Sequence, residues 1–115
     1  MEKQEKFKKK WNIIDYTAKN WAYLQEGADV MVYPCGFASI KFQKNINKDQ
    51  FGQWLIENKI VSLDPDGKGY QLWVGFFNQS LQHKEAYAEK VVEMLETLVW
   101  TEDEDPKVRT WSKLD

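Results

Sequence analysis

The sequence contains very few of the residues that covalent and metal chemistry require. Among its 115 residues there is one cysteine, Cys35, and one histidine, His83. A single cysteine excludes an internal disulfide and any zinc or iron–sulfur site that needs several thiolates. This composition is typical of proteins of the reducing cytoplasm, and we therefore expect a cytoplasmic protein that carries no metal and no cofactor.

Long apolar runs are also missing from the chain. No stretch approaches the roughly 20 apolar residues that are needed to cross a bilayer. The lysine-rich start around Lys8, Lys9 and Lys10 has no apolar segment of the kind that a signal peptide contains. We expect no association with a membrane.

Recognisable catalytic motifs are absent as well. The sequence has no glycine-rich phosphate loop, no His-Glu-x-x-His pair and no serine nucleophile elbow. Residues 64–69 combine acids and glycines, but they lack the twelve-residue spacing and the closing glutamate of a calcium loop. Cys35 and His83 would act together only with a base in hydrogen-bonding reach and an orienting group, and the sequence indicates neither. We expect a protein that is not an enzyme.

The chain carries little net charge, although its charged residues are distributed unevenly. Sixteen basic and eighteen acidic residues leave a net charge of −2, which does not favour a binder of duplex DNA. The first twenty residues hold six lysines against three acids, whereas an acidic block near the other end consists of Glu102, Asp103, Glu104 and Asp105. The two ends therefore carry opposite charge.

Aromatic residues are what the sequence does contain. Six Trp, five Tyr and six Phe make up 15% of the chain. Trp and Tyr combine a large apolar area with a polar edge, so they anchor protein interfaces and, beside basic residues, stack on bases. A single domain of this size needs most of these rings for its core. The few that the core leaves over are the candidates for binding.

Periodicity predicts a long first helix over residues 3–24. Its apolar residues follow spacings of four, three, four and three, and they are Phe7, Trp11, Ile14, Ala18 and Trp21. Gly27 is the expected stop. The segment 30–42 is rich in strand-forming residues and is interrupted by Pro34-Cys35-Gly36, which predicts two short strands joined by a tight turn.

Two further helices and a hairpin follow. Asn47 is the expected N-cap of a short helix whose buried face holds Phe51, Trp54 and Leu55. The turn residues 64–69 separate two strand-forming segments, 60–63 and 70–77, which predicts a hairpin. Ser80 is the expected cap of the last helix. The apolar positions of that helix are Leu81, Ala88, Val91, Leu95 and Leu98.

These elements predict one α+β domain over residues 1–115. It contains a four-stranded, mainly antiparallel sheet in the order α-ββ-α-ββ-α, with helices packed on it. An acidic loop at 101–106 ends the last helix, and a short tail over 107–115 folds back onto the domain through Val108 and Trp111.

Alternation within the strands assigns side chains to the two faces of the sheet. The apolar face holds Ala38, Ile40, Phe42, Tyr70, Leu72, Val74 and Phe76. The opposite face mixes rings, polar groups and one cation, and its members are Phe37, Ser39, Lys41, Gln71, Trp73 and Phe77. Such a mixture is typical of a half-exposed binding face.

Three arrangements of this second face remain open. The first helix closes it as a second core, the face stays open for a partner, or the helix docks on a second copy of the chain and forms a homodimer. The closed arrangement is slightly favoured, because the apolar stripe of the helix must be buried.

The last helix also carries an acidic ridge. Its glutamates recur at spacings of four, four and three, at Glu85, Glu89, Glu93 and Glu96, and the block over residues 102–105 continues them. Such a ridge is either an ordinary solvated helix face or a surface that meets a basic partner by imitating phosphate charge.

Two hypotheses for function follow. The first is a small interaction module that binds and modulates another protein through Phe37, Lys41, Gln71, Trp73 and Phe77. Inhibitors and immunity-type proteins encoded by bacteriophages or mobile elements are often this compact, which is a consideration of size alone. The second is a single-stranded nucleic-acid-binding domain in which the sheet rings stack on bases. The interleaved segment Lys8, Lys9, Lys10 and Trp11 would then follow the phosphates.

Overall fold

A computed structural model describes residues 2–24, 36–75, 81–101 and 107–114. The chain begins with the long helix α1 (Glu2–Tyr23) and continues with strand β1 (Gly36–Gln43), the short 3-10 helix η1 (Lys44–Lys48) and helix α2 (Gln50–Glu57). Strands β2 (Ser62–Leu63) and β3 (Gly69–Trp73) form a hairpin before helix α3 (Leu81–Leu98) and the final strand β4 (Val108–Leu114). The predicted α+β class is confirmed.

The four strands form one antiparallel sheet in the order β2-β3-β1-β4. Strand β1 is central, with β3 on one side and the edge strand β4 on the other. The tail over 107–115 thus supplies a strand of the sheet. The earlier strand that was predicted near residues 30–33 lies outside the described residues, as do Gly27, Pro34 and Cys35.

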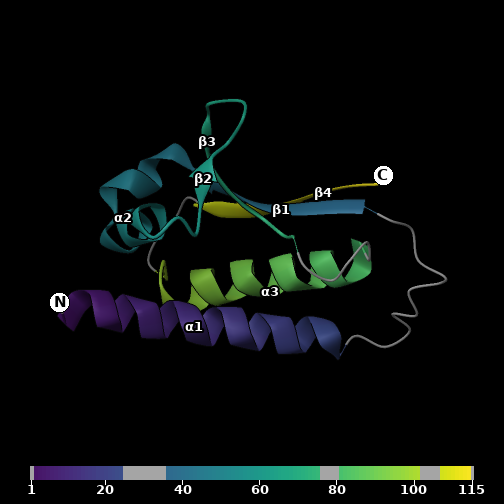
Figure 1. The fold of residues 1–115 in the computed structure, drawn as a ribbon, viewed down its shortest axis with the longest axis horizontal. Coiled ribbons are helices and arrows are strands. Elements are labelled where there is room, and N and C mark those ends of the chain that lie inside the picture. The colour runs from purple at the N-terminus through teal and green to yellow at the C-terminus, as the bar shows by residue number, and fades with distance from the viewer. Residues whose placement is uncertain (1, 25–35, 76–80, 102–106, 115) are drawn as a thin grey trace.

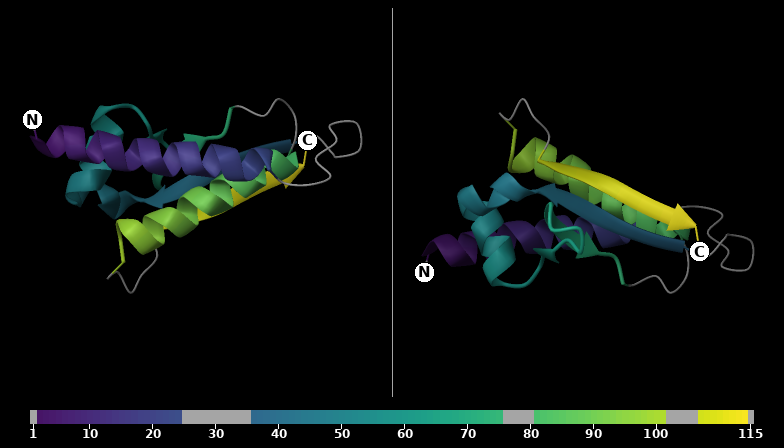
Figure 2. Two further views of the ribbon diagram at one scale, coloured as in Figure 1. Left: turned by 90° about the horizontal axis from the view of Figure 1, so that it is seen from below. Right: turned by 90° about the horizontal axis from the view of Figure 1, so that it is seen from above.

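Helices α1 and α3 lie side by side beneath one face of the sheet (Figure 1), and α2 lies at one end. Seen from the opposite side, the sheet is in front of both long helices (the right-hand view of Figure 2). No described helix covers that second face. The slightly favoured expectation that the first helix closes it is therefore wrong, because the stripe of α1 is buried against α3 and the apolar face.

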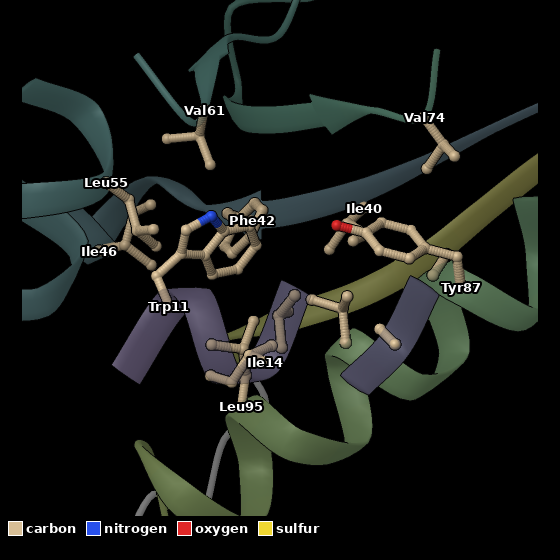
Figure 3. Packing of buried hydrophobic residues seen from close by; sticks show 14 of the residues in the cluster. Trp11, Ile14, Ile40, Phe42, Ile46, Leu55, Val61, Val74, Tyr87 and Leu95 are labelled. Carbon is tan, nitrogen blue, oxygen red and sulfur yellow. The ribbon is translucent and has the colours of Figure 1, made fainter. Parts of the chain in front are cut away.

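The core lies between the sheet and the two long helices (Figure 3). Trp11 and Ile14 of α1 meet Ile40 and Phe42 of β1, and Leu95 of α3 closes the layer from below. Most of the predicted core positions are buried, as are Phe51, Trp54 and Leu55 of α2.

Two predicted core residues lie at the surface instead. Leu98, at the last position of α3, is 52% exposed. Trp21 is 46% exposed because Ala22, one position further along α1, takes the buried place. Its indole lies against a neighbouring helix, with the Lys90 Nζ 4.8 Å from the ring centroid.

A polar contact also joins the two long helices. The buried hydroxyl of Tyr87 donates a hydrogen bond of 2.5 Å to Asp15 Oδ1, and Asp15 Oδ2 lies 3.1 Å from Lys19 Nζ. Burial, together with the hydrogen bond to the Asp15 carboxylate, raises the pKa of Tyr87 far above its ordinary value. The phenol is therefore neutral and links α1 to α3.

The cap of α2 differs from the prediction, whereas the hairpin agrees with it. Asp49, and not Asn47, caps α2, since its side chain accepts a 2.8 Å hydrogen bond from the backbone N–H of Gly52. Asn47 lies within η1. The hairpin is confirmed: the N–H of Asp64 donates to the carbonyl of Gly69 at 2.8 Å. The proposed cap Ser80 and the strand residues Phe76 and Phe77 lie outside the described residues.

Candidate functional site

Three aromatic rings stand next to one another on the open face of the sheet. Trp73 of β3 lies between Phe37 of β1, at 5.6 Å between ring centroids, and Trp111 of β4, at 6.3 Å. Both pairs are tilted, at 36° and 38° between ring planes. We call these three residues the ring row. Trp73 is its most exposed member, with 48% of its surface accessible.

The small residue Ser39 explains how two rings from different strands meet. Ser39 is the register partner of both Trp73 and Trp111, so the two indoles flank it across the sheet. It is fully buried although it points to the open face. Its Oγ lies 3.2 Å from the Leu72 carbonyl oxygen and 3.3 Å from Gln71 Oε1, and the hydroxyl can donate a hydrogen bond to either oxygen. A larger side chain at this position would separate the rings.

Lys41 organises the polar part of the face. Its ammonium donates to Asp64 Oδ2 at 2.8 Å and to Gln71 Oε1 at 3.0 Å. The same Nζ lies 5.2 Å from the centroid of the Trp111 ring, a distance typical of a cation–π contact. The hydrogen bond from Lys41 is the main reason that the pKa of Asp64 lies below its ordinary value. This pair anchors the hairpin turn to the ring row.

A second lysine supports the other end of the row from below. Lys84 of α3 is only 5% exposed, and its Nζ donates to the Gly36 carbonyl oxygen at 3.0 Å. That Nζ also lies 5.8 Å from the centroid of the Phe37 ring. The rings are thus held at both ends by cations whose positions are fixed by other hydrogen bonds. The ring row is preorganised in the free chain.

The edge strand adds positive charge beside the rings. Arg109 and Lys113 lie two positions before and after Trp111 on β4, on the same face of the sheet, and both are exposed. In the register, Arg109 is opposite Lys41 and Lys113 is opposite Phe37. A shallow recess of about 160 Å³ lies over the end of β1, between Arg109 of β4 and the hairpin turn. Its charged lining residues are Lys41, Asp64, Asp66, Lys68 and Arg109.

The structure brings together four of the five residues that sequence analysis assigned to partner binding, Phe37, Lys41, Gln71 and Trp73, and the fifth, Phe77, lies outside the described residues. Sequence reasoning missed Trp111, Arg109 and Asp64. The strand-forming residues Val108, Thr110 and Trp111 are a local signal of a strand, but the face on which Trp111 lies follows only from its pairing with β1.

The basic segment of α1 does not join this surface. Trp11 is 6% exposed and belongs to the core. Lys8 and Lys9 are exposed and Lys10 is partly exposed, and their helix, α1, lies beneath the sheet (Figure 1), whereas the Lys41 side chain belongs to the open face, where its Nζ contacts the Trp111 ring. These lysines therefore cannot continue a path of positive charge that begins at Lys41.

The acidic ridge is likewise separate from the open face. Glu89, Glu93 and Glu96 are exposed and Glu85 is partly exposed, all on α3, which lies beneath the sheet. The Glu93 carboxylate lies 3.5 Å from Lys90 Nζ, an ordinary exposed helix pair. The continuation at Glu102, Asp103, Glu104 and Asp105 lies outside the described residues.

No metal site is found within the part of the chain that the structure describes. In that part, no three His, Cys, Asp or Glu side chains are grouped so as to hold a metal ion, and no helix is long and apolar enough to cross a membrane. The His83 ring lies beside Tyr23, at 6.3 Å between centroids, and Cys35 lies outside the described residues.

Comparisons with protein-family models, with curated proteins and with solved structures find no match to this chain. The case for function therefore depends on the geometry of the open face.

Proposed function

We propose that the chain is a non-enzymatic interaction module that binds another protein through the open face of its sheet and modulates or inhibits that protein. The observation that carries the proposal is the position of Trp73. Nearly half of its surface is accessible, yet the ring packs between Phe37 and Trp111 on a face that no described helix covers.

Such a ring suits the centre of a protein interface. Interface hot spots are enriched in Trp, Tyr and Arg, and they are surrounded by polar groups at the rim. Here Trp73 and Trp111 lie near Arg109, Lys41 and Gln71. Because neighbouring rings already restrict Trp73, a partner that covers it would pay little side-chain entropy.

Single-stranded nucleic acid is the second candidate, and one observation favours it. Arg109 and Lys113 flank Trp111 on β4, and no carboxylate of the described residues lies within ion-pair distance of either cation. Two cations beside an aromatic surface are typical of domains that stack bases and contact phosphates. Two other observations favour a protein partner. The charge of Lys41 is compensated by Asp64, and the three rings pack against one another instead of standing apart to admit bases.

A pull-down from the source lysate, with and without nuclease, tests the proposal. The tagged chain should retain one discrete protein after nuclease treatment, and Trp73→Ala should lose it. Tyr16→Ala is the matched control, because Tyr16 is 70% exposed and belongs to α1, which lies beneath the opposite face of the sheet. Recovery that disappears with nuclease would support the nucleic-acid alternative. Equal capture by wild type and Trp73→Ala would overturn the assignment to this face.

A further inference from the structure

The outer edge of β4 is a row of main-chain groups available for pairing. The N–H of Gln43 donates to the Lys107 carbonyl at 2.8 Å. These two residues lie directly opposite each other, one position beyond the Phe42–Val108 pair. In an antiparallel pair, hydrogen-bonded residues alternate. The odd-numbered residues of β4 therefore bond to β1, whereas Val108, Thr110 and Ser112 direct their N–H and C=O groups away from the sheet.

The other side of β1 supports this assignment. The N–H of Val74 donates to the carbonyl of Ala38 at 3.1 Å, so the even-numbered residues of β1 bond to β3 and leave the odd-numbered ones for β4. Within the described ranges, no strand lies beyond β4 in the sheet. Thr110 and Ser112 are both exposed, so an incoming chain can reach this edge.

The charges of β4 select the kind of chain that fits. Strand β4 carries Arg109 and Lys113, two positions on either side of Trp111, and the strand has no acid. No carboxylate of the described residues lies within ion-pair distance of either cation. A strand added at this edge would place its own side chains directly opposite these residues, where unlike charges stabilise the pair and like charges destabilise it.

A second copy of β4 fits poorly for the same reason. The register that pairs the whole strand with itself, antiparallel and centred on Trp111, sets Arg109 opposite Lys113 twice. Lysines and arginines on edge strands are a common protection against such self-pairing. An acidic segment placed in the same register would instead meet two opposite charges.

We infer that the outer edge of β4 binds an extended, acidic segment of the partner protein as a fifth strand of the sheet. The segment has carboxylates opposite Arg109 and Lys113 and an apolar or β-branched residue opposite Trp111. This inference rests on the proposed function, because it assigns to the same partner a second contact, made with the main chain of the edge and, among the three rings, with Trp111 alone.

The test uses the ¹⁵N-labelled full chain and a capped peptide, Thr-Glu-Thr-Val-Thr-Glu-Thr, whose palindromic sequence presents the same pattern in either direction. We expect the amide signals of Thr110 and Ser112 to shift on titration. The peptide with Lys in place of Glu should not bind. The acidic peptide N-methylated at its third and fifth residues should bind about tenfold more weakly or not at all, because it lacks the N–H groups that face β4.

Protein variants separate edge pairing from charge attraction. Ser112→Pro removes an outward N–H without removing a bond to β1, and it should weaken binding of the acidic peptide about tenfold, whereas Ser112→Ala should retain it. Equal binding of the N-methylated peptide, equal binding by Ser112→Pro, or no binding of the acidic peptide overturns the inference. A dimer in sedimentation that Ser112→Pro dissociates would also overturn it, since a second copy would then occupy the edge.

This test can be distinguished from the test of the proposed function, because it uses a defined peptide in place of the captured partner and variants at Ser112 in place of Trp73. Loss of partner capture by Trp73→Ala together with no peptide binding would leave the proposed function in place and remove only the edge contact.

Discussion

At the scale of single residues, the open face depends on one small and one charged side chain. Ser39 is small enough for two indoles to approach each other above it, and Lys41 joins Trp111, Gln71 and Asp64 through one ammonium group. Each of these residues fixes its neighbours by direct contact. The open face is therefore ordered within the chain itself.

The Lys41–Asp64 pair gives the stability of the chain a predictable dependence on pH. The pKa of Asp64 is lower in the folded chain than the ordinary 3.8, so its stabilising contribution is present above that pH and is lost as the pH falls through the folded pKa. Asp64→Asn should lower the free energy of unfolding by about 1 to 2 kcal/mol near neutral pH. This difference should shrink below pH 3.8.

Denaturant unfolding at several pH values measures the effect. Asp66→Asn is the control, because Asp66 belongs to the same turn and its Oδ1 accepts a hydrogen bond from the N–H of Lys68, with no contact to Lys41. If the Asp64→Asn difference stayed constant down to acid pH, or matched that of Asp66→Asn, the assigned role of the pair would be incorrect.

At the scale of elements, a glycine determines how α2 docks on the turn that precedes it. A β-carbon added at Gly52 would lie 2.0 Å from the Ile46 carbonyl oxygen of η1. That oxygen belongs to the backbone, so η1 would have to shift, at a cost in stability, to relieve the clash. The Asp49 cap bonds to the N–H of the same residue. The close approach of η1 and α2 thus requires both the missing side chain of Gly52 and its amide.

Gly52→Ala should therefore destabilise the chain by about 2 to 3 kcal/mol, even though alanine is the better helix former. Gly75→Ala is the matched control, since the nearest atom to its added β-carbon would be 4.0 Å away, in ordinary van der Waals contact. Thermal unfolding of the two variants gives the comparison. A Gly52→Ala chain as stable as Gly75→Ala would show that η1 and α2 are not locked together in this way.

At the scale of the whole molecule, the chain separates its two uses of aromatic residues. Trp11, Trp54, Trp100 and Phe42 are buried between sheet and helices, whereas Trp73 and Trp111 lie on the opposite side of the sheet with Phe37. The acidic ridge and the basic segment of α1 are both on the helical side. Among the described residues, the open face is where three packed rings adjoin a polar, basic rim.

A feature could be predicted from the sequence when the residues that determine it are close together along the chain. The stripe of α1, the hairpin around residues 64–69 and the alternation of β1 and β3 are local patterns, and they predicted the elements and four of the open-face residues correctly. The covering of a face is a long-range property: the α1 stripe specifies burial but not against which surface. Sequence analysis predicted only a tail at residues 108–114, where the structure has a strand. The strand pairs with residues 70 positions earlier, such as Ile40 with Thr110, and local periodicity carries no information on such a distant pairing.

The most direct test of the central claim is the affinity of the purified partner, once captured, for wild type, Trp73→Ala and Tyr16→Ala, measured by titration calorimetry beside the Tm of each chain. Trp73→Ala should weaken binding by at least about 2 kcal/mol, or roughly thirtyfold in Kd, with Tm shifted by no more than about 5 °C, while Tyr16→Ala changes neither. An unchanged Kd for Trp73→Ala, or a Tm that collapses with it, would contradict the account, because the ring would then be outside the interface or part of the core.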